Sequence, residues 1–489
     1  MAIYHLTANV ISRARGQSMV AAAAYRLGAT LRDQRYGVTH NYVGKRGVIH
    51  SQIMAPAAAP HWVHDREALW NRVEAGESRK DSQLARLIEV GLPIELSADE
   101  RVALVRDYVA EEFVAKGMIA DFCVRGDPNN PHAHILLTLR ALTATGFGPK
   151  ERRWNGKPVL LEWRCAWAER VNEHLARAGH AARVDHRTLA AQQVELIPER
   201  RVGIGRARAA ARALPAHLEE RIAEQQRIAK TNTETILEDP SVALRALTRQ
   251  RPAFTRQELV QYLRARTQNA AELDAVLTAV FQSSELVALR AEGGEERFTS
   301  QDMIEAEKSL LRRTASMAAR RGHGVPLDRQ NILSAQRMLR DSARQAFMCL
   351  VSEGDVKALA VASGCKAAIL AAAAQAWGEQ GLAVRGVAPS RRAAGALQAA
   401  SGIGSQSFAA FEEEWQSESE MSRETVLLLD GAELLGLKQL ERFLAVADRA
   451  RAKAVSVGDF DQLRAARAES PFRDLMRNIP DSVEVSHDC

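Results

Sequence analysis

The sequence has few cysteines, and none stands in the spacing of a zinc finger or a disulfide framework. The five residues, Cys123, Cys165, Cys349, Cys365 and Cys489, are scattered and include no Cys-x-x-Cys pair. Small secreted domains depend on closely spaced cysteines, whereas proteins of a reducing compartment do not. The cysteine content therefore predicts a cytoplasmic protein without a structural zinc site.

The sequence also lacks a long apolar run. The longest run, residues 367–377, is rich in alanine and is about half the length of a helix that crosses a bilayer. The first residues contain no apolar segment of signal-peptide length. Both observations predict a soluble protein that does not insert into a membrane.

Neither sign of charge dominates, and aromatic residues are few. The 66 Lys and Arg residues nearly balance 60 Asp and Glu residues, which leaves a net charge of +6. This balance permits a nucleic-acid partner without identifying one, because the clustering of the basic residues decides the matter. Aromatic residues make up only 5% of the chain, which limits how many bases can stack on side chains.

Residues 1–195 mix strands and helices. Residues 18–27 are rich in alanine and end at Gly28, which is typical of a helix. Residues 97–100 read Ser-Ala-Asp-Glu, a capping box that opens a helix reaching about residue 116. Strands are predicted over residues 2–13, 84–92, 118–124 and 132–139, and another helix over residues 161–178. This order predicts an antiparallel sheet with helices on its faces.

Two further units are predicted after residue 195. Residues 196–325 begin with a charged helical linker and continue with two helices and a hairpin, a pattern typical of a winged helix. Residues 326–489 alternate helices with strands at 357–362, 382–388, 425–430 and 453–458, which indicates a parallel sheet. The predicted fold class of the whole chain is α/β.

The strongest chemical signal is the segment Asn-Pro-His-Ala-His at residues 130–134. His132 and His134 lie two residues apart on a predicted strand, so both side chains point to the same face. Two imidazoles side by side provide two-thirds of a divalent-metal site. The pattern also fits a half-exposed strand face that binds no metal, and it does not decide between the two by itself.

Five stretches resemble the MobA/MobL relaxases and their larger TraA relatives. They are MAIYHLTANVISRARGQSMVAAAAYR at the start, SRKDSQLARLIEVGLPIELS at 78–97, GMIADFCVRGDPNNPHAHILLTLR at 117–140, GFGPKERRWN at 146–155 and WRCAWAERVNEHLARAGHAARVDHRTLAAQ at 163–192. The resemblance implies that residues 1–195 form a HUH-type endonuclease domain. Its activity would be to nick single-stranded DNA at a transfer origin during plasmid mobilisation.

The resemblance implies that Tyr25 is the nucleophile. Its phenolic oxygen would attack one phosphodiester and form a 5′-phosphotyrosyl adduct, which conserves the bond energy for strand re-joining. Tyr4, Tyr36 and Tyr42 are weaker candidates, because none lies in the alanine-rich helix. The cofactor implied is a divalent ion, Mg²⁺ or Mn²⁺, held by His132 and His134 and polarising the phosphate.

Further site residues are predicted around these. Glu89 is a charge inside an apolar strand and is assigned to catalysis beside the metal, with a structural ion pair as the alternative. Basic residues predicted to contact DNA are Arg26, Arg79, Lys80, Arg86, Arg125 and Arg140. The implied partners are single-stranded and hairpin DNA at a transfer origin, accessory proteins of the relaxosome and the coupling protein of a type IV secretion system.

One position departs from the family pattern. The family supplies a third metal-binding histidine seven residues before the first histidine of the pair, and here that position is Arg125. A guanidinium cannot ligate a cation and would repel one, although it can bind phosphate. Either His132 and His134 hold the metal with Glu89 or Asp127, or the chain is a catalytically impaired relaxase-like DNA-binding protein.

Residues 326–489 are predicted to form a degenerate RecA-like helicase half. Within them, four stretches are AWGEQGLAVRGVAPSRRAAGAL, SGIGSQSFAAFEEEW, VLLLDGAELLGLKQLERFL and VGDFDQL. Through these stretches residues 340–475 resemble the first motor domain of the RecD-like helicase that follows the relaxase in TraA proteins. The phosphate-binding loop is degenerate, because Ala360-Val361-Ala362-Ser363-Gly364-Cys365-Lys366-Ala367 lacks both anchoring glycines and the hydroxyl that binds magnesium. Lys366, Asp430, Asp459 and Gln462 remain as vestigial positions. We therefore expect no bound nucleotide and no ATPase or helicase activity, with the fold retained as a DNA-binding or docking surface.

Overall fold

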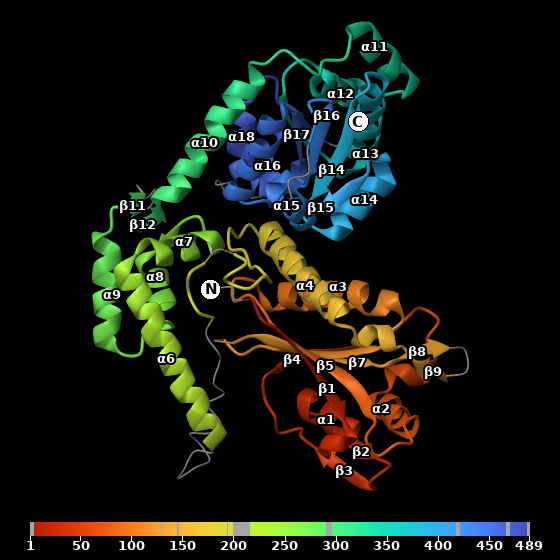
Figure 1. Cartoon of the computed structure of the whole chain (residues 1–489). Coiled ribbons are helices and arrows are strands. Elements are labelled where there is room, and N and C mark those ends of the chain that lie inside the picture. The colour runs from red at the N-terminus through yellow and green to blue at the C-terminus, as the bar shows by residue number, and fades with distance from the viewer. Residues whose placement is uncertain are drawn as a thin grey trace. The chain divides into compact units, whose positions relative to one another are not determined.

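The computed structural model describes residues 4–128, 130–143, 146–192, 194–198, 216–289, 296–416, 421–465 and 470–486. These residues form two compact units, Met1–His186 and Arg187–Cys489 (Figure 1). The first half of the predicted linker, residues 199–215, and the tip of the predicted hairpin, residues 290–295, lie outside the described residues.

The first unit is built on a five-stranded antiparallel sheet with the strand order β1-β5-β7-β6-β4. Its strands are β1 (Leu6–Ser12), β4 (Val48–Met54), β5 (Gln83–Gly91), β6 (Ala120–Arg125) and β7 (His132–Thr138). Two hairpins flank it, β2 (Thr30–Asp33) with β3 (Val38–Asn41) and β8 (Arg140–Thr143) with β9 (Gly146–Lys150). The prediction of an antiparallel sheet is confirmed, although β4 and both hairpins were not predicted.

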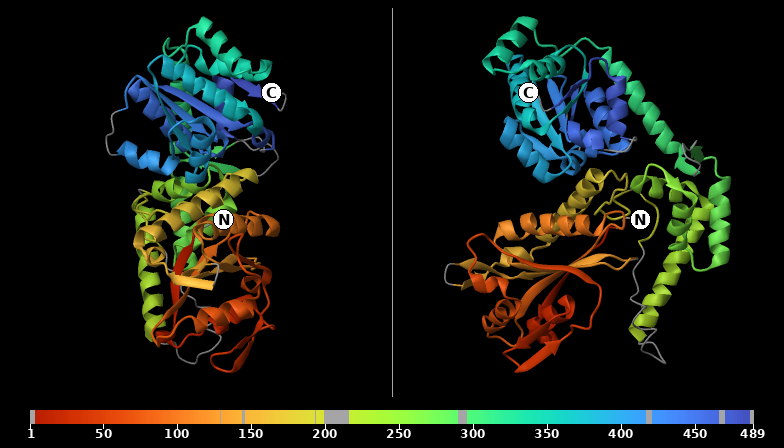
Figure 2. Two further views of the ribbon diagram at one scale, coloured as in Figure 1. Left: turned by 90° about the vertical axis from the view of Figure 1, so that its right-hand side faces the viewer. Right: turned by 180° about the vertical axis from the view of Figure 1, so that it is seen from behind.

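Helices cover both faces of this sheet (Figures 1 and 2). On one face α3 (Ala98–Glu112) and α4 (Lys157–Arg177) pack over a core that includes Trp163 and Trp167. On the other face α1 (Met19–Leu27) and α2 (Arg66–Ala75) pack over a second core around Trp70. Short 3₁₀ helices lie at Arg13–Arg15, His61–His64, Val114–Lys116 and Arg152–Asn155.

Local signals explain where two of the three predicted helices of this unit begin and where the first of them ends. The Ser18 hydroxyl accepts a hydrogen bond from the Ala21 amide at the start of α1, and Gly28 ends the helix in the left-handed conformation, with φ of 65°. The capping box of Ser97 and Glu100 is formed at the start of α3. Both helices therefore lie close to where the sequence predicted them.

The second unit begins with a largely helical part. Its helices are α6 (Ala216–Glu238), α7 (Ser241–Gln250), α8 (Arg256–Arg264), α9 (Ala270–Gln282) and α10 (Gln301–Ala318). The short strands β10 (Phe254–Thr255), β11 (Leu286–Leu289) and β12 (Arg297–Ser300) form an antiparallel sheet in the order β10-β12-β11. The pair α8 and α9 followed by the β11–β12 pair agrees with the predicted winged-helix-like fold.

The remainder of the second unit is a six-stranded parallel sheet in the order β15-β14-β16-β17-β13-β18. Its strands are β13 (Val356–Val361), β14 (Ala383–Ala388), β15 (Ser405–Ser407), β16 (Thr425–Asp430), β17 (Lys453–Asp459) and β18 (Val483–Val485). The helices are α11 (Leu327–Gln336), α12 (Asp341–Val351), α13 (Ser363–Glu379), α14 (Arg391–Ser401), α15 (Phe408–Gln416), α16 (Leu437–Ala450), α17 (Phe460–Ala465) and α18 (Pro471–Asn478), with a 3₁₀ turn at Ala432–Leu434. The predicted parallel sheet is confirmed.

Two expectations from composition can be compared with the structure. No helix among the described residues is long and apolar enough to cross a membrane. Cys123, Cys165 and Cys349 are free thiols among the described residues.

Candidate active site

The register of the antiparallel sheet collects polar side chains at one end of the face that α1 covers. Glu89 of β5 pairs with His134 of β7, and Arg125 of β6 pairs with His132. Residues paired across antiparallel strands point to the same face. Cys123, the β6 partner of His134, is buried in the core that includes α1, which identifies that face. The structure therefore brings together His132, His134 and Glu89, as the sequence predicted.

The histidines interact with Glu89 at close range. His134 Nε2 lies 3.5 Å from Glu89 Oε2, and the ring centroids of His132 and His134 are 5.0 Å apart. His134 above all, with His132 and His5, lowers the pKa of Glu89 to about 2, so the carboxylate is ionised at neutral pH. Burial lowers the pKa of His134. Within the described part of the chain, Nδ1 of His134 is buried and has no hydrogen-bond partner.

His132 is oriented by the turn that precedes it. Its Nδ1 lies 2.8 Å from the carbonyl oxygen of Asn130. A carbonyl only accepts, so Nδ1 carries the proton in this contact and Nε2 is left as the acceptor. The Asn-Pro segment that the sequence placed at the start of the strand therefore also fixes the imidazole.

A third histidine, His5, belongs to this cluster and was not predicted. The amide of Gly91 donates to the His5 carbonyl at 3.1 Å, which places His5 beside the strand position that pairs with His132. The charge of His5 also contributes to the lowered pKa of Glu89. His5 lies in the strand predicted over residues 2–13. It stands two residues before Thr7, which pairs with Glu89, so the two residues of β-strand spacing bring His5 to the same face.

Tyr25 lies in the last turn of α1 and is held by a loop that follows β3. The Lys45 ammonium stands 3.3 Å from the centre of the Tyr25 ring and 3.1 Å from the Tyr25 carbonyl oxygen. The Tyr42 ring meets the Tyr25 ring edge-on at 5.3 Å. The loop approaches α1 this closely because Gly28 has no side chain, since a Cβ there would lie 3.1 Å from the Lys45 carbonyl oxygen. Lys45 was not predicted as a site residue.

Arg26 links the end of α1 to the histidines. Burial lowers the pKa of its guanidinium, whereas Cys123, Glu89 and Tyr25 raise it, and Arg26 in turn lowers the pKa of His134. Its Nη1 donates to the Ala22 carbonyl oxygen at 3.1 Å. Its Nε is buried without a hydrogen-bond partner among the described residues. The Nε–H group of Arg26 thus has no acceptor within that part of the protein.

Arg125 stands where the family pattern has its third histidine. Its Nη2 donates to the Arg46 carbonyl oxygen at 2.7 Å, in the same loop as Lys45. Its Nη1 is buried and lacks a hydrogen-bond partner in the described ranges. Asp127, the other alternative ligand, accepts a hydrogen bond from the Asn130 amide at 3.2 Å within its own turn.

These residues do not fit a three-ligand metal site. Among the residues that the structure describes, no group of three His, Cys, Asp or Glu side chains is arranged to hold a metal ion. The position that would complete the His132 and His134 pair carries a guanidinium, which has no lone pair to donate. We therefore assign no step to a metal ion at this site.

Comparison with known proteins assigns two parts of the chain to protein families. Residues 17–212 match the MobA/MobL family, and residues 338–487 match an AAA domain. Residues 17–212 belong to the MobA/MobL family. This MobA/MobL domain carries Tyr25, Glu89, His132 and His134, and the AAA match covers the parallel sheet.

The relatives are conjugal transfer and mobilisation proteins. Conjugal transfer protein TraA of Rhizobium radiobacter is 32% identical over 98% of this chain and 48% of its own length. Mobilization protein MobL of Acidithiobacillus ferridurans is 36% identical over 42% of this chain and 62% of its own. A solved structure from work on vancomycin resistance transfer in Staphylococcus aureus is 35% identical over 38% of this chain and all of its own, with a TM-score of 0.37. The chain spans about half the length of the TraA relatives it matches.

The remaining predicted DNA-contacting residues of the MobA/MobL domain differ in accessibility. Lys80 and Arg79 are exposed, although Arg79 pairs with Asp81 at 2.9 Å. Arg140 is bound to Glu77 at 2.9 Å and to the Gly148 carbonyl oxygen at 2.9 Å. Arg86 is buried and donates to the Trp154 carbonyl oxygen, so its predicted contact with DNA is wrong.

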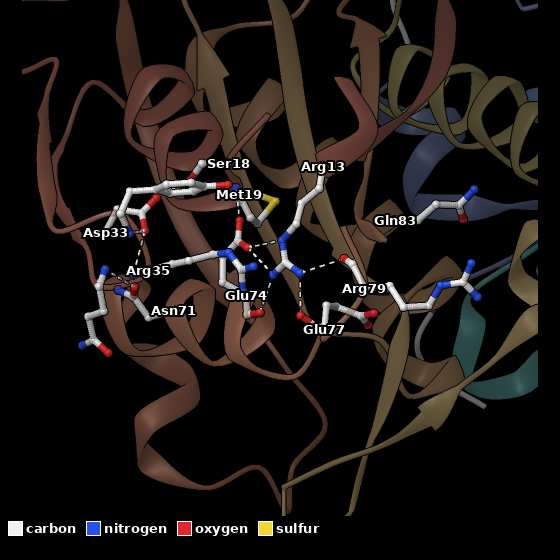
Figure 3. Close-up of polar contacts among 12 residues, drawn as sticks. Arg13, Ser18, Met19, Asp33, Arg35, Asn71, Glu74, Glu77, Arg79 and Gln83 are labelled. Atoms are coloured by element: carbon white, nitrogen blue, oxygen red, sulfur yellow. Dashed lines mark hydrogen bonds and ion pairs between the residues drawn. The ribbon is translucent and has the colours of Figure 1, made fainter. Parts of the chain in front are cut away.

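A buried ion pair anchors the start of α1 in the MobA/MobL domain (Figure 3). Arg13 Nη2 lies 2.7 Å from Glu74 Oε2, and the other oxygen of Glu74 accepts from the Met19 amide at 2.6 Å. Arg13 also donates to the carbonyl oxygens of Glu77 and Arg79. A carboxylate at a helix N-terminus is favoured by the helix dipole. This network fixes the helix that carries Tyr25.

Replacing Glu74 by alanine is expected to destabilise the MobA/MobL domain by about 3–5 kcal/mol, because it leaves the buried Arg13 guanidinium without its counter-charge. Urea unfolding followed by tryptophan fluorescence measures the change, since Trp70 is buried in the same core. Asp81→Ala is the matched control, because the Arg79–Asp81 pair is 79% and 55% exposed and solvent screens its attraction. Equal effects of the two substitutions would contradict the assignment.

The vestigial nucleotide positions lie at the carboxyl edge of the parallel sheet. Lys366 Nζ is 2.8 Å from Asp430 Oδ1, and Asp459 accepts from the Gln462 amide at 2.9 Å. Burial raises the pKa of Glu433 to about 8, and its Oε2 is buried without a hydrogen-bond partner within the described ranges. Glu433 was not predicted. Because Lys366 is already paired with Asp430, its charge is offset within the protein.

The chain is expected to show no ATP hydrolysis above background. The glycines that cradle phosphates are absent at Ala360 and Cys365, and Lys366 is engaged by Asp430. A coupled ATPase assay with single-stranded DNA measures this, with Lys366→Met as the paired variant. Hydrolysis by the wild-type chain that disappears in Lys366→Met would show that the site works.

Proposed function

We propose that this chain is a relaxase that nicks single-stranded DNA at a transfer origin through Tyr25. The observation that carries the proposal is the position of Tyr25 at the end of α1, where the Lys45 ammonium stands 3.3 Å from its ring. The neighbouring Arg26 adds a second cation, whose charge acts on Tyr25, Glu89 and His134. The proximity of Tyr25 to these cations, in a domain that matches the MobA/MobL family, supports its assignment as the nucleophile.

The proposed reaction is a transesterification. The phenolic oxygen of Tyr25 forms a bond to phosphorus, the bond from phosphorus to the 3′-oxygen breaks, and the phenolic proton ends on that 3′-oxygen. The products are a 5′-phosphotyrosyl adduct and a free 3′-hydroxyl. No external oxidant or cofactor is needed for the balance of atoms and electrons.

The surrounding residues stabilise the phosphate in this proposal. Arg26 and Lys45 supply positive charge where negative charge accumulates on the phosphoryl oxygens. His132 presents Nε2, and His134 has a buried ring nitrogen without a partner among the described residues. A divalent ion, as the family resemblance implies, would polarise the same phosphate when bound, but the donors gathered here do not complete its ligand set.

The proposed partners follow from the same assignment. Conjugal transfer relatives cover almost the whole chain, which supports transfer-origin DNA, relaxosome accessory proteins and a secretion coupling protein as partners in the cytoplasm. The AAA-like part would act as a DNA-binding or docking surface, because its lysine is neutralised by Asp430.

A second function, DNA binding without cutting, is favoured by one observation. Arg125 stands where the family resemblance implies a metal-binding histidine, and a guanidinium cannot ligate the metal. The two functions are separated by incubating the protein with labelled single-stranded DNA tiled across the region around its own gene. A slower-migrating covalent species in denaturing gels supports the relaxase, and retained binding without any such species supports the DNA-binding alternative.

A further inference from the structure

Three cationic side chains lie on the part of the domain that carries Tyr25, His132 and His134. We call Arg26, Lys45 and Arg125 the cation cluster. The Lys45 ammonium contacts the ring of Tyr25. The charges of Glu89 and Tyr25 act on Arg26. Arg125 pairs with His132 across neighbouring strands, so the two side chains point to the same face of the sheet. Lys45 and Arg125 are also tied to one loop, because Arg125 donates to the carbonyl oxygen of the next residue, Arg46.

This charge distribution disfavours a divalent ion. Glu89 is the one carboxylate brought into the cluster by the contacts above, and it already interacts with His134 at 3.5 Å. Like charges at short range in a half-buried site repel more strongly than in water, because the local dielectric constant is lower. A phosphodiester, by contrast, carries the charge that these cations attract.

Two of the three cations also present unused hydrogen-bond donors. Nε of Arg26 and Nη1 of Arg125 are buried and have no acceptor within the described part of the protein. A buried donor without an acceptor costs free energy in the unbound protein. Phosphoryl oxygens supply such acceptors, and guanidinium groups bind them through paired N–H groups. The unsatisfied donors thus match an anion, whereas a metal ion would need lone pairs.

We propose that the cation cluster takes the place of a divalent metal, so that Tyr25 attacks the phosphodiester without one. This proposal rests on the proposed relaxase function. The guanidinium groups of Arg26 and Arg125 hold the two non-bridging oxygens of the phosphate, and Lys45 offsets charge at the attacking phenolic oxygen. The bonds formed and broken are those of the transesterification above, with the phenolic proton ending on the 3′-oxygen.

The first experiment measures adduct formation by the full chain in EDTA and in Mn²⁺. Wild-type protein is expected to form the adduct in EDTA at a rate within about twofold of its rate in Mn²⁺. Arg125→His is expected to lose on the order of 10- to 100-fold in EDTA, because one charged donor to the phosphate is gone, and to recover in Mn²⁺. Arg153→His is the matched control, since Arg153 is exposed and pairs only locally with Glu151, and it is expected to behave as wild type.

The second experiment measures metal binding without DNA. Mn²⁺ titration followed by electron paramagnetic resonance is expected to show no tight site in the wild-type chain and one new site in Arg125→His, with thermal melting confirming that the variant is folded. An adduct that forms only with metal, or tight Mn²⁺ binding by the wild-type chain, overturns the proposal. If no adduct forms either in EDTA or in Mn²⁺, the relaxase function itself is contradicted, and the metal-free mechanism is then wrong as well.

Discussion

Replacement of Tyr25 by phenylalanine is expected to abolish the covalent protein–DNA adduct, a loss on the order of 10³-fold or more, because the attacking oxygen is removed. Phenylalanine keeps the ring that packs against Lys45 and Tyr42, so the variant should fold and bind DNA like the wild type. Adduct yield on labelled single-stranded DNA and retention of the DNA in a gel-shift assay measure the two properties separately.

Tyr42→Phe and Tyr36→Phe are the matched controls for this prediction. Tyr42 meets Tyr25 ring to ring, and phenylalanine preserves that contact, while Tyr36 is 53% exposed on the same unit. Both variants are expected to keep adduct formation near the wild-type level. Loss of the adduct in either control, with Tyr25→Phe still active, would move the nucleophile to another tyrosine.

Replacement of Arg26 by methionine is expected to slow adduct formation by about 10²-fold, the effect of removing one donor to developing negative charge. Methionine retains much of the apolar stem, and burial of the wild-type guanidinium already lowers its pKa, so the fold should not be weakened. Single-turnover kinetics at saturating DNA measure the rate of the chemical step apart from binding.

Arg26→Lys provides the comparison that separates charge from geometry. Lysine keeps the positive charge but lacks the planar fork of N–H donors, so a partial rate, between those of wild type and methionine, is expected. Arg79→Met is the surface control, because the Arg79 side chain is 79% exposed and pairs with Asp81. An equal loss of rate in Arg79→Met at saturating DNA would show that the effect is not specific to Arg26, and would contradict its role in the chemical step.

Much of the fold follows from local signals in the sequence. The helix α1 was predicted because Ser18, a run of alanines and Gly28 each favour its start, interior and end. The strands of the parallel sheet were predicted because β13 and β16 are buried along their whole length and consist mostly of apolar residues. By contrast, β4 (Val48–Met54) was not predicted as a strand, because exposed and half-buried residues alternate over only part of its length.

The site was predicted only where its residues are neighbours in sequence or match a motif. His132, His134 and Tyr25 stood in recognisable stretches, and Glu89 was visible as a charge inside an apolar strand. His5 and Lys45 were missed because their proximity depends on long-range packing. His5 reaches the cluster through the pairing of β1 with β5, and Lys45 reaches Tyr25 through a loop that packs against Gly28.

The central claim, that Tyr25 becomes joined to DNA, is tested most directly by mapping the adduct. After reaction, nuclease digestion and trypsin cleavage, residues 16–26 form a peptide in which Tyr25 is the one tyrosine. Mass spectrometry should find this peptide with a nucleotide attached to Tyr25 in the wild-type protein and unmodified in Tyr25→Phe. A nucleotide on a peptide containing Tyr4, Tyr36 or Tyr42 instead, or no modified peptide from protein that binds the DNA, would contradict the account.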